Sequence, residues 1–207
     1  GLNNVDAVRD VSPVDTSGEE RHRVSQRNSV SGVSDLLPLQ IRQATADDIE
    51  IVAALGDALQ RHLAAPPIYL PLLHLDSRAE YLQWLAQPGH VQWLALRDGV
   101  AVAELRLEPS NDTAGAIAAD AQSTFITGAY TIPQARKGGL AAALLAHAVD
   151  DARARGRARV VTDFESANIP AAAFWMRHFR PITFSVVRYV DERAAFAHAG
   201  RRVEDFW

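Results

Sequence analysis

The sequence predicts an α/β domain built on a mixed sheet, and two stretches carry this prediction. Residues 90–96 and 100–107 alternate in the manner of strands, and Asp98-Gly99 between them favours a tight turn, so they form a hairpin. Further along, a strand at 124–132, a helix at 139–155 and a strand at 160–164 follow one another. A strand, a crossover helix and a second strand give a parallel pair.

Composition limits the classes of protein that this chain can represent. With 207 residues and 48% hydrophobic residues, the chain can bury the core of one ordinary domain. The absence of cysteine excludes disulfides, thiolate metal sites and a cysteine nucleophile, and it fits a reducing cytoplasm. No apolar run approaches a membrane span of about 20 residues. A net charge of −4 argues against nucleic acid. We therefore expect a cytoplasmic protein with no nucleic acid, membrane or metal partner.

The chain divides into three parts. Residues 1–37 are rich in Ser, Asp, Arg and Val and show no sustained period, so we expect a flexible extension. An arm that docks on a partner or on the domain itself is the alternative. Residues 38–193 form the domain, and residues 194–207 form a C-terminal tail.

The first half of the domain starts with a strand at 39–44. Thr45 can cap a helix that ends before Pro66-Pro67, and Ser77-Arg-Ala-Glu80 is a capping box that opens a second helix. The connection at 65–74 is unusually apolar for a loop, which fits either core packing or a wall of an acceptor pocket.

The most informative stretch runs from the strand at 124–132 into the helix at 139–155. A helix start presents unpaired N–H groups and partial positive charge, so it can bind a phosphate. Gly138 and Gly139 can let an anion approach the main chain, and Arg136 and Lys137 add positive charge. The alternative is a turn whose glycines only tighten the corner. No Walker loop or Gly-x-Gly-x-x-Gly motif is present.

Two segments resemble the GNAT superfamily of N-acetyltransferases. Arg136-Lys-Gly-Gly139-Leu-Ala141 fits the Gln/Arg-x-x-Gly-x-Gly/Ala pyrophosphate loop of that family. The segment from Asn168 through Ala171 to Phe174-Trp175 matches the family's Asn-x-x-Ala-x-x-aromatic-aromatic pattern. The resemblance covers about residues 40–193. It implies a mixed, mostly antiparallel central sheet with helices on both faces and a splayed central strand pair.

The resemblance also implies an acetyl-coenzyme A site. Backbone groups of Ala129 and Thr131 would pair with the pantetheine arm, and main-chain N–H groups of 137–141 would hold the diphosphate with help from Arg136. Asn168 would bind the arm or cap its helix. The expected cofactor-binding residues are Ala129, Tyr130, Thr131, Arg136, Lys137, Gly138, Gly139, Leu140, Ala141, Asn168 and Trp175.

For the chemistry, an amine must attack the thioester while a base takes its proton. The N–H of Thr131 would meet the oxyanion, and Glu165 is the first candidate for the base, with Glu104 the second. Trp175 stands where many family members carry a tyrosine that protonates the thiolate. Either Tyr130, Tyr189 or a water replaces that tyrosine, or turnover is slow.

We therefore expect an N-acetyltransferase that moves an acetyl group from acetyl-coenzyme A to a primary amine by direct attack in a ternary complex. The alternative is an acyl-coenzyme A binding regulatory or sensor domain without efficient catalysis, which Trp175 favours. The sequence does not identify the amine acceptor, and the chain can be a monomer or a homodimer.

Overall fold

The computed structural model describes residues 2–11, 39–72, 74–109, 117 and 120–187. These residues form seven strands, four α-helices and short 3-10 turns. The strands are β1 (Leu2–Asp10), β2 (Gln40–Gln43), β3 (Val91–Arg97), β4 (Val100–Glu108), β5 (Ser123–Thr131), β6 (Arg159–Glu165) and β7 (Arg180–Val187). The helices are α1 (Ile49–Ala64), α2 (Arg78–Leu85), α3 (Leu140–Ala154) and α4 (Ile169–His178).

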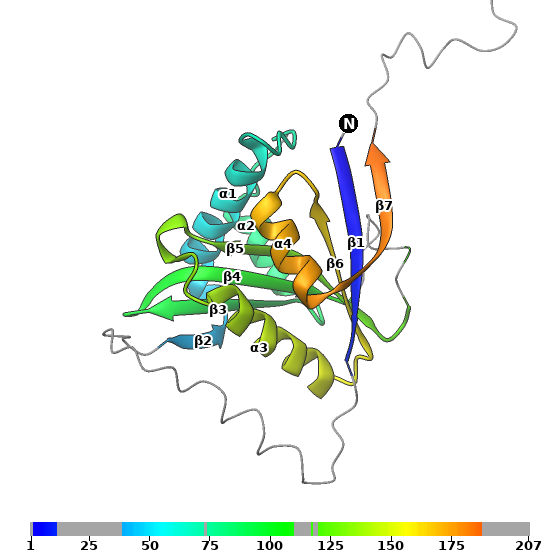
Figure 1. Ribbon diagram of the computed structural model, residues 1–207. Coiled ribbons are helices and arrows are strands. Elements are labelled where there is room, and N and C mark those ends of the chain that lie inside the picture. Colours follow the sequence, from blue (N-terminus) through cyan, green and yellow to red (C-terminus); the bar gives the residue numbers. More distant parts are fainter. Residues whose placement is uncertain (1, 12–38, 73, 110–116, 118–119, 188–207) are drawn as a thin grey trace, which may run out of the picture.

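One sheet organises the molecule, with the strand order β2-β3-β4-β5-β6-β1-β7. Every neighbouring pair is antiparallel except β5 and β6, which are parallel and joined through α3. Helices α3 and α4 lie over one face of the sheet, and α1 and α2 lie behind it (Figure 1). The predicted class, a mixed and mostly antiparallel sheet with helices on both faces, is confirmed.

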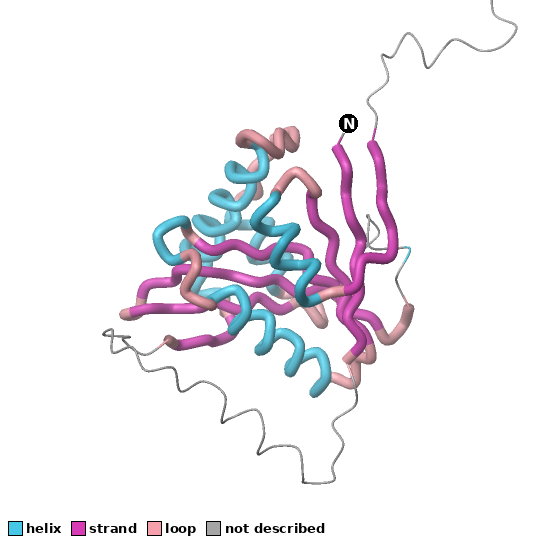
Figure 2. The backbone as a smooth tube through the Cα atoms, in the orientation of Figure 1, coloured by secondary structure: helices cyan, strands magenta, loops and turns pink. Residues whose placement is uncertain are grey.

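Strands β5 and β6 pair over a short length and then diverge. Their parallel register runs from Ser123 opposite Arg159 to Ile126 opposite Thr162. Directly after it, the pairing of β5 with β4 shifts, because Leu107 lies opposite Ile126 while Arg106 lies opposite Gly128. The extra residue, Thr127, makes a β-bulge, and a bulge bends a strand and increases its twist. The rest of β5 therefore leaves β6, and a wedge opens between them (Figure 2).

The N-terminal residues differ from the expected flexible extension. Leu2–Asp10 is a strand inside the sheet, antiparallel to β6 on one side and to β7 on the other. Val5 and Ala7 are buried against the α4 side, where their cluster includes Trp175 and Phe179. The alternation of apolar Val5 and Ala7 with polar residues is a strand signal, but it is too short to stand out among the polar residues around it. Residues 12–38 lie outside the described part of the chain.

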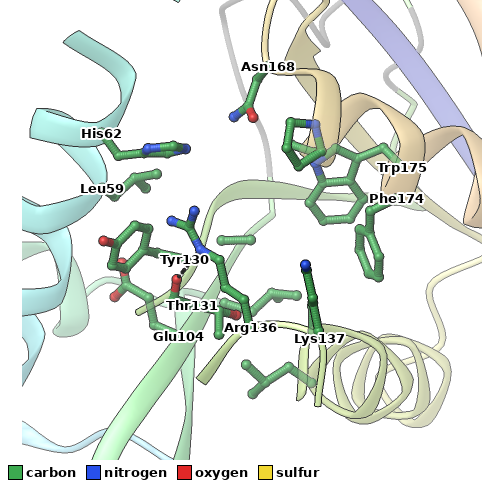
Figure 3. Close-up of a pocket in the computed structure, with 16 residues that line it drawn as sticks. Leu59, His62, Glu104, Tyr130, Thr131, Arg136, Lys137, Asn168, Phe174 and Trp175 are labelled. Atoms are coloured by element: carbon green, nitrogen blue, oxygen red, sulfur yellow. Dashed lines mark hydrogen bonds between the residues drawn. The ribbon is translucent and has the colours of Figure 1, made fainter. Parts of the chain in front are cut away.

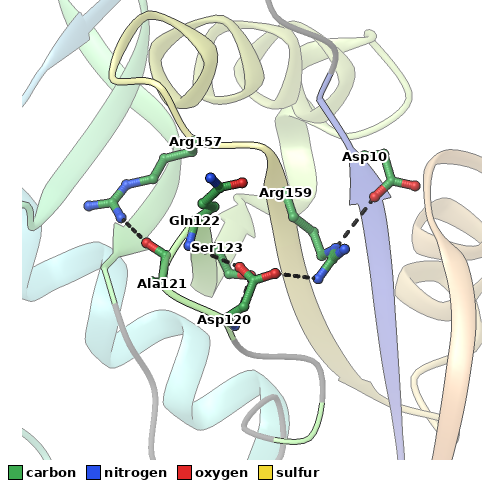
Figure 4. A network of polar contacts seen from close by, with 7 residues as sticks. All are labelled: Asp10, Asp120, Ala121, Gln122, Ser123, Arg157 and Arg159. Atoms are coloured by element: carbon green, nitrogen blue, oxygen red, sulfur yellow. Dashed lines mark hydrogen bonds and ion pairs between the residues drawn. The ribbon is translucent and has the colours of Figure 1, made fainter.

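A polar network holds the C-terminal end of β1 (Figure 4). Arg159 at the start of β6 pairs with Asp120 at 2.8 Å and with Asp10 at 3.4 Å. Asp120 also accepts a hydrogen bond from the Ser123 hydroxyl at the start of β5. Three segments distant in sequence therefore meet at one arginine.

The remaining elements follow the sequence prediction closely. Thr45 begins a 3-10 turn that leads into α1, and α1 ends before Pro66. Ser77 and Glu80 form the predicted capping box of α2, and Asp98-Gly99 makes the hairpin turn with both φ angles positive. The predicted tail at 194–207 lies outside the described residues. Among the described helices, none combines the length and apolar character that crossing a bilayer would need.

Burying a charge at the centre of β1 should destroy the fold if β1 is an interior strand. Ala7 is fully buried, so Ala7→Asp should lower the free energy of unfolding by about 3 kcal/mol or more, measured by denaturant titration. The control is Asp10→Asn on the same strand, which changes one exposed ion pair and should cost well under about 1 kcal/mol. Equal unfolding midpoints for the two variants would place β1 outside the sheet.

Candidate active site

The wedge between β5 and β6 opens into a cavity of about 420 Å³. Residues of α1, β4, β5, the β5–α3 turn, α3 and α4 line it (Figure 3). The predicted site residues on its wall are Glu104, Ala129, Tyr130, Thr131, Arg136, Lys137, Ala141, Asn168 and Trp175. The fold thus brings together two motifs that lie about 30 residues apart.

The start of α3 has the form of an anion-binding turn. Lys137 and Gly139 both have positive φ, at 66° and 75°, and a Cβ at Gly139 would meet nothing within 4 Å. The N–H groups of Leu140, Ala141 and Ala142 have no acceptor among the described residues. These free donors and the helix dipole favour an anion, and Lys137 points from this turn toward the cavity (Figure 3).

The upper part of β5 presents free backbone to the wedge. The N–H of Ile132 donates to the carbonyl of Val102 on β4 at 3.0 Å, and the register places Tyr130 opposite Glu104. Because hydrogen-bonding direction alternates along an antiparallel strand, Ala129 and Thr131 direct their N–H and C=O groups away from β4. An extended ligand in the wedge can pair with these groups as an added strand.

Arg136 folds back over the cavity. Its Nε donates to the carbonyl of Thr131 at 3.0 Å, and its guanidinium lies 5.7 Å from the centre of the Tyr130 ring. The cation therefore stays beside the wedge, between the end of β5 and the start of α3. An anion bound at the start of α3 would compete with the Thr131 carbonyl for the Arg136 guanidinium.

Helix α4 supplies the opposite wall. Asn168 is its N-cap residue, but its side chain makes no capping hydrogen bond and points toward the cavity (Figure 3). Trp175 is buried, with its ring in edge contact with Phe174 and Phe179. Trp175 thus forms an apolar wall, and its indole N–H cannot supply a proton as a tyrosine would.

His62 at the end of α1 is a cavity residue that the sequence analysis missed. Its ring lies 6.1 Å from the ring of Tyr130 and faces the cavity (Figure 3). Burial, and then the nearby Arg136, hold its pKa below the usual value. The signal was the helical spacing of Leu59, His62 and Leu63 on one face of α1, with a polar member among apolar ones.

Glu104 is on the cavity wall but its carboxylate is already engaged. It is 1% exposed, accepts a hydrogen bond from the Gln92 amide and lies 3.4 Å from Arg106. Burial raises its pKa, while Arg106 and Gln92 oppose that shift. Glu104 is thus held by its neighbours on β3 and β4.

Glu165 lies in a second, smaller cavity of about 170 Å³ that shares Leu59, Ala129, Asn168, Ala171 and Trp175 with the first. The remaining wall brings β6 against α1 and the segment that follows it. Glu165 and Asp163 lie on one side, and Leu63 and Leu70 belong to the other elements. The two cavities are therefore neighbours in the wedge, and both are lined by α1 and α4.

Three carboxyl groups gather on β6 and β1. The register places Asp6 opposite Asp163, and Asn4, opposite Glu165, donates to Asp163 at 3.0 Å. Burial raises the pKa of all three carboxyls, and Asp163 adds to the shift at Asp6 and at Glu165. Asp6 is fully buried, and neither of its oxygens has a hydrogen bond of normal geometry, although Ser185 is near enough to oppose the pKa shift.

The comparisons with known proteins agree on one family. The sequence model of the acetyltransferase (GNAT) family matches residues 58–179. No curated protein matches the sequence. Among solved structures, a ribosomal-protein-alanine N-acetyltransferase from Brucella melitensis is 25% identical, with a TM-score of 0.53, and the match covers 67% of this chain and 82% of that one.

Two further structures share the fold at lower identity. A GCN5-related N-acetyltransferase from Ralstonia eutropha is 20% identical, with a TM-score of 0.56 over 74% of this chain and 99% of that one. The aminoglycoside N-acetyltransferase AAC(6')-Iy in complex with CoA is 17% identical, with a TM-score of 0.58 over 77% and 99%.

The buried Asp6 predicts a pH-dependent stability difference. Because its folded-state pKa is raised, its charge costs stability above that pKa, and the cost disappears as pH falls toward the unfolded value near 4. Asp6→Asn should therefore be more stable than the wild type at pH 8, by about 1 kcal/mol or more, with the difference shrinking toward pH 5. Denaturant unfolding of both proteins at each pH measures it. A difference that is constant with pH would contradict a raised pKa at Asp6.

Proposed function

Because the chain belongs to the GNAT family of acetyltransferases, we propose that it moves an acetyl group from acetyl-coenzyme A to a primary amine by direct attack in a ternary complex. The divergence of β5 from β6 after Ile126 is the observation that carries the proposal. The divergence leaves an unpaired edge of β5 for an amide-containing arm. It also leaves the start of α3, which can bind an anion, open to a diphosphate.

The proposed positions of acetyl-coenzyme A follow from these two features. The diphosphate lies against the N–H groups of 137–141, and Lys137 and Arg136 balance its charge. The pantetheine arm runs along Ala129 and Thr131, beside Asn168 and the apolar face of Trp175. This order places the thioester near the wedge, where the two cavities meet.

The amine nitrogen then attacks the thioester carbon, and the N–H of Thr131 stabilises the developing oxyanion. The new C–N bond forms, the C–S bond breaks, and coenzyme A leaves as the thiolate. Glu165 takes the proton that the amine loses, because its raised pKa suits a group that must accept a proton near neutral pH. Tyr130 on the cavity wall can return a proton to the thiolate, and Tyr189, the other candidate tyrosine, lies outside the described residues.

The proposed function leaves open which primary amine accepts the acetyl group. The structural relatives are named for aminoglycosides and for the alanine of a ribosomal protein, and one was solved with sisomicin. We therefore include sisomicin and a peptide with N-terminal alanine in the acceptor panel. Release of free thiol from acetyl-coenzyme A, dependent on one of these amines, is the test of transfer.

A second candidate is a binding module that holds acyl-coenzyme A without efficient turnover. Trp175 favours it, because a buried indole occupies the place where the family often carries the acid. Tight binding of acetyl-coenzyme A with no thiol release from any amine in the panel would support the module and overturn the enzyme.

The turn at Gly139 offers a test of cofactor binding with a matched control. Gly139→Asp adds a negative charge at the proposed diphosphate site and should weaken acetyl-coenzyme A binding by about 10-fold or more. Gly156 lies just beyond the other end of α3, has a similar φ of 73° and likewise has nothing near its Cβ. Gly156→Asp imposes the same backbone strain and charge there, so its affinity should stay within about 2-fold of the wild type. Calorimetry measures both, and equal losses would place the ligand elsewhere.

Glu165→Gln should lower kcat by about 100-fold without changing acetyl-coenzyme A affinity, since it removes only the proton acceptor. The acidic limb of the pH–rate profile, which reports the ionised carboxylate, should disappear in the variant. Glu50→Gln, an exposed carboxylate on α1, is the control and should keep the wild-type profile. An unchanged profile in Glu165→Gln would assign the proton to another group.

A further inference from the structure

The second cavity has walls of two different chemistries. Its β6 wall carries the carboxylates of Asp163 and Glu165, while α1 and the segment after it contribute Leu59, Leu63 and Leu70. Alternation along β6 puts Val161, Asp163 and Glu165 on one face, which is also the face of Phe125 on β5. A ligand here therefore meets two carboxyl groups on one side and apolar side chains on the other.

The anionic wall is reinforced from behind by β1. Asp6 lies directly opposite Asp163 on the same face of the sheet, and it is 0% exposed with both oxygens unpartnered. One oxygen of Glu165, Oε2, is also buried without a partner. Within the described part of the chain, no Arg, Lys or His forms an ion pair with any of these three carboxylates.

Buried carboxylates without a cation are costly, and they become favourable when a cation enters. The neighbours that the three groups do have are neutral: Asn4, which donates to Asp163, and Ser185, which lies near Asp6. Neither supplies positive charge. An ammonium group that enters the cavity beside Asp163 would supply that charge and favour the ionised carboxylates, which burial alone disfavours.

We infer that the acceptor is a linear alkyl diamine or polyamine, with one amine at the thioester near Glu165 and a second ammonium group held by Asp163, with Asp6 behind it. This inference rests on the proposed function, because it names the acceptor of the same site. Glu165 and Asp163 are two residues apart on β6, about 6.6 Å along the strand. A chain of four or five methylene groups spans that distance.

The leucine wall decides which kind of cation fits. An alkyl spacer can pack against Leu59, Leu63 and Leu70, which removes its methylene groups from water. An aminosugar would instead leave hydroxyl groups against that wall without partners. Acceptors that carry a carboxylate beside the amine are disfavoured, because Asp163 and Glu165 would repel it.

A matched pair of acceptors tests the second charge. Cadaverine and n-pentylamine have the same five-carbon chain, and only cadaverine carries a second amine. With acetyl-coenzyme A and the full chain, we expect kcat/KM for cadaverine to exceed that for n-pentylamine by about 10-fold or more.

The variant Asp163→Asn tests whether the Asp163 charge is what binds the second ammonium group. The variant keeps the shape of the side chain and an oxygen that can still accept from Asn4, and it should bring the cadaverine to n-pentylamine ratio close to 1. Its loss should appear in KM for cadaverine, while the affinity for acetyl-coenzyme A stays near wild type. Because Asp163 also raises the pKa of Glu165, kcat can change for both amines, and the ratio of the two acceptors is the readout since both use the same base. Asp150→Asn, an exposed carboxylate on α3, is the control and should leave the ratio unchanged.

The outcomes separate the two proposals. A wild-type ratio near 1, or a ratio that survives Asp163→Asn, overturns the diamine inference while leaving transfer to amines intact. Binding of acetyl-coenzyme A with turnover of sisomicin or the alanine peptide, and of neither five-carbon amine, also overturns it. Absence of acetyl-coenzyme A binding overturns the proposed function itself.

Discussion

The bulge at Thr127 is the constraint on which the rest of the structure depends. Up to Ile126, β5 is an ordinary interior strand with a neighbour on each side; after the bulge it keeps β4 and leaves β6. Backbone N–H and C=O groups in an interior strand are normally paired, so strands separate only where something else can satisfy them. Here the opening is bounded by a helix start on one side and by an asparagine that does not cap its helix on the other. The fold therefore leaves its unsatisfied polar groups together, at the place where a ligand of matching length can pair with them.

The N-terminal strand gives the wedge a rigid far side. A strand that diverges from its partner weakens the sheet, and β6 would be an edge without β1. Strand β1 pairs with β6 from Asn4 to Asp10 and places Asn4 and Asp6 beside the carboxyl groups of the second cavity. Sheet stability and site electrostatics are therefore coupled through the same nine residues, because the strand that closes the sheet also carries the buried charge.

The sequence predicted the elements whose signals are local. The capping box of α2, the Asp98-Gly99 turn and the glycines before α3 each act within a few residues, and the structure has all of them where they were expected. The features that the sequence analysis missed depend on contacts between segments far apart in the sequence. Residues 2–10 are polar enough to read as an extension, and only their two partner strands, more than 140 residues away, make them a strand. His62 and the pairing of Asp6 with Asp163 were missed for the same reason, since their meaning depends on which elements the fold brings together.

The two ends of the wedge carry opposite charge. This separation would let a chain of net charge −4 bind acetyl-coenzyme A, the polyanionic cosubstrate proposed for it. Lys137, Arg136 and the start of α3 are positive at one end, and Asp163 and Glu165 are negative at the other. Each end would attract its own ligand and repel the other. A diphosphate at the start of α3 and an ammonium group beside Asp163 would then place the reacting ends near Ala129, which lines both cavities and whose backbone faces away from β4. Charge separation across the sheet would thus orient both reactants before any catalytic group acts, which is the form of catalysis that a site with few acids and bases requires.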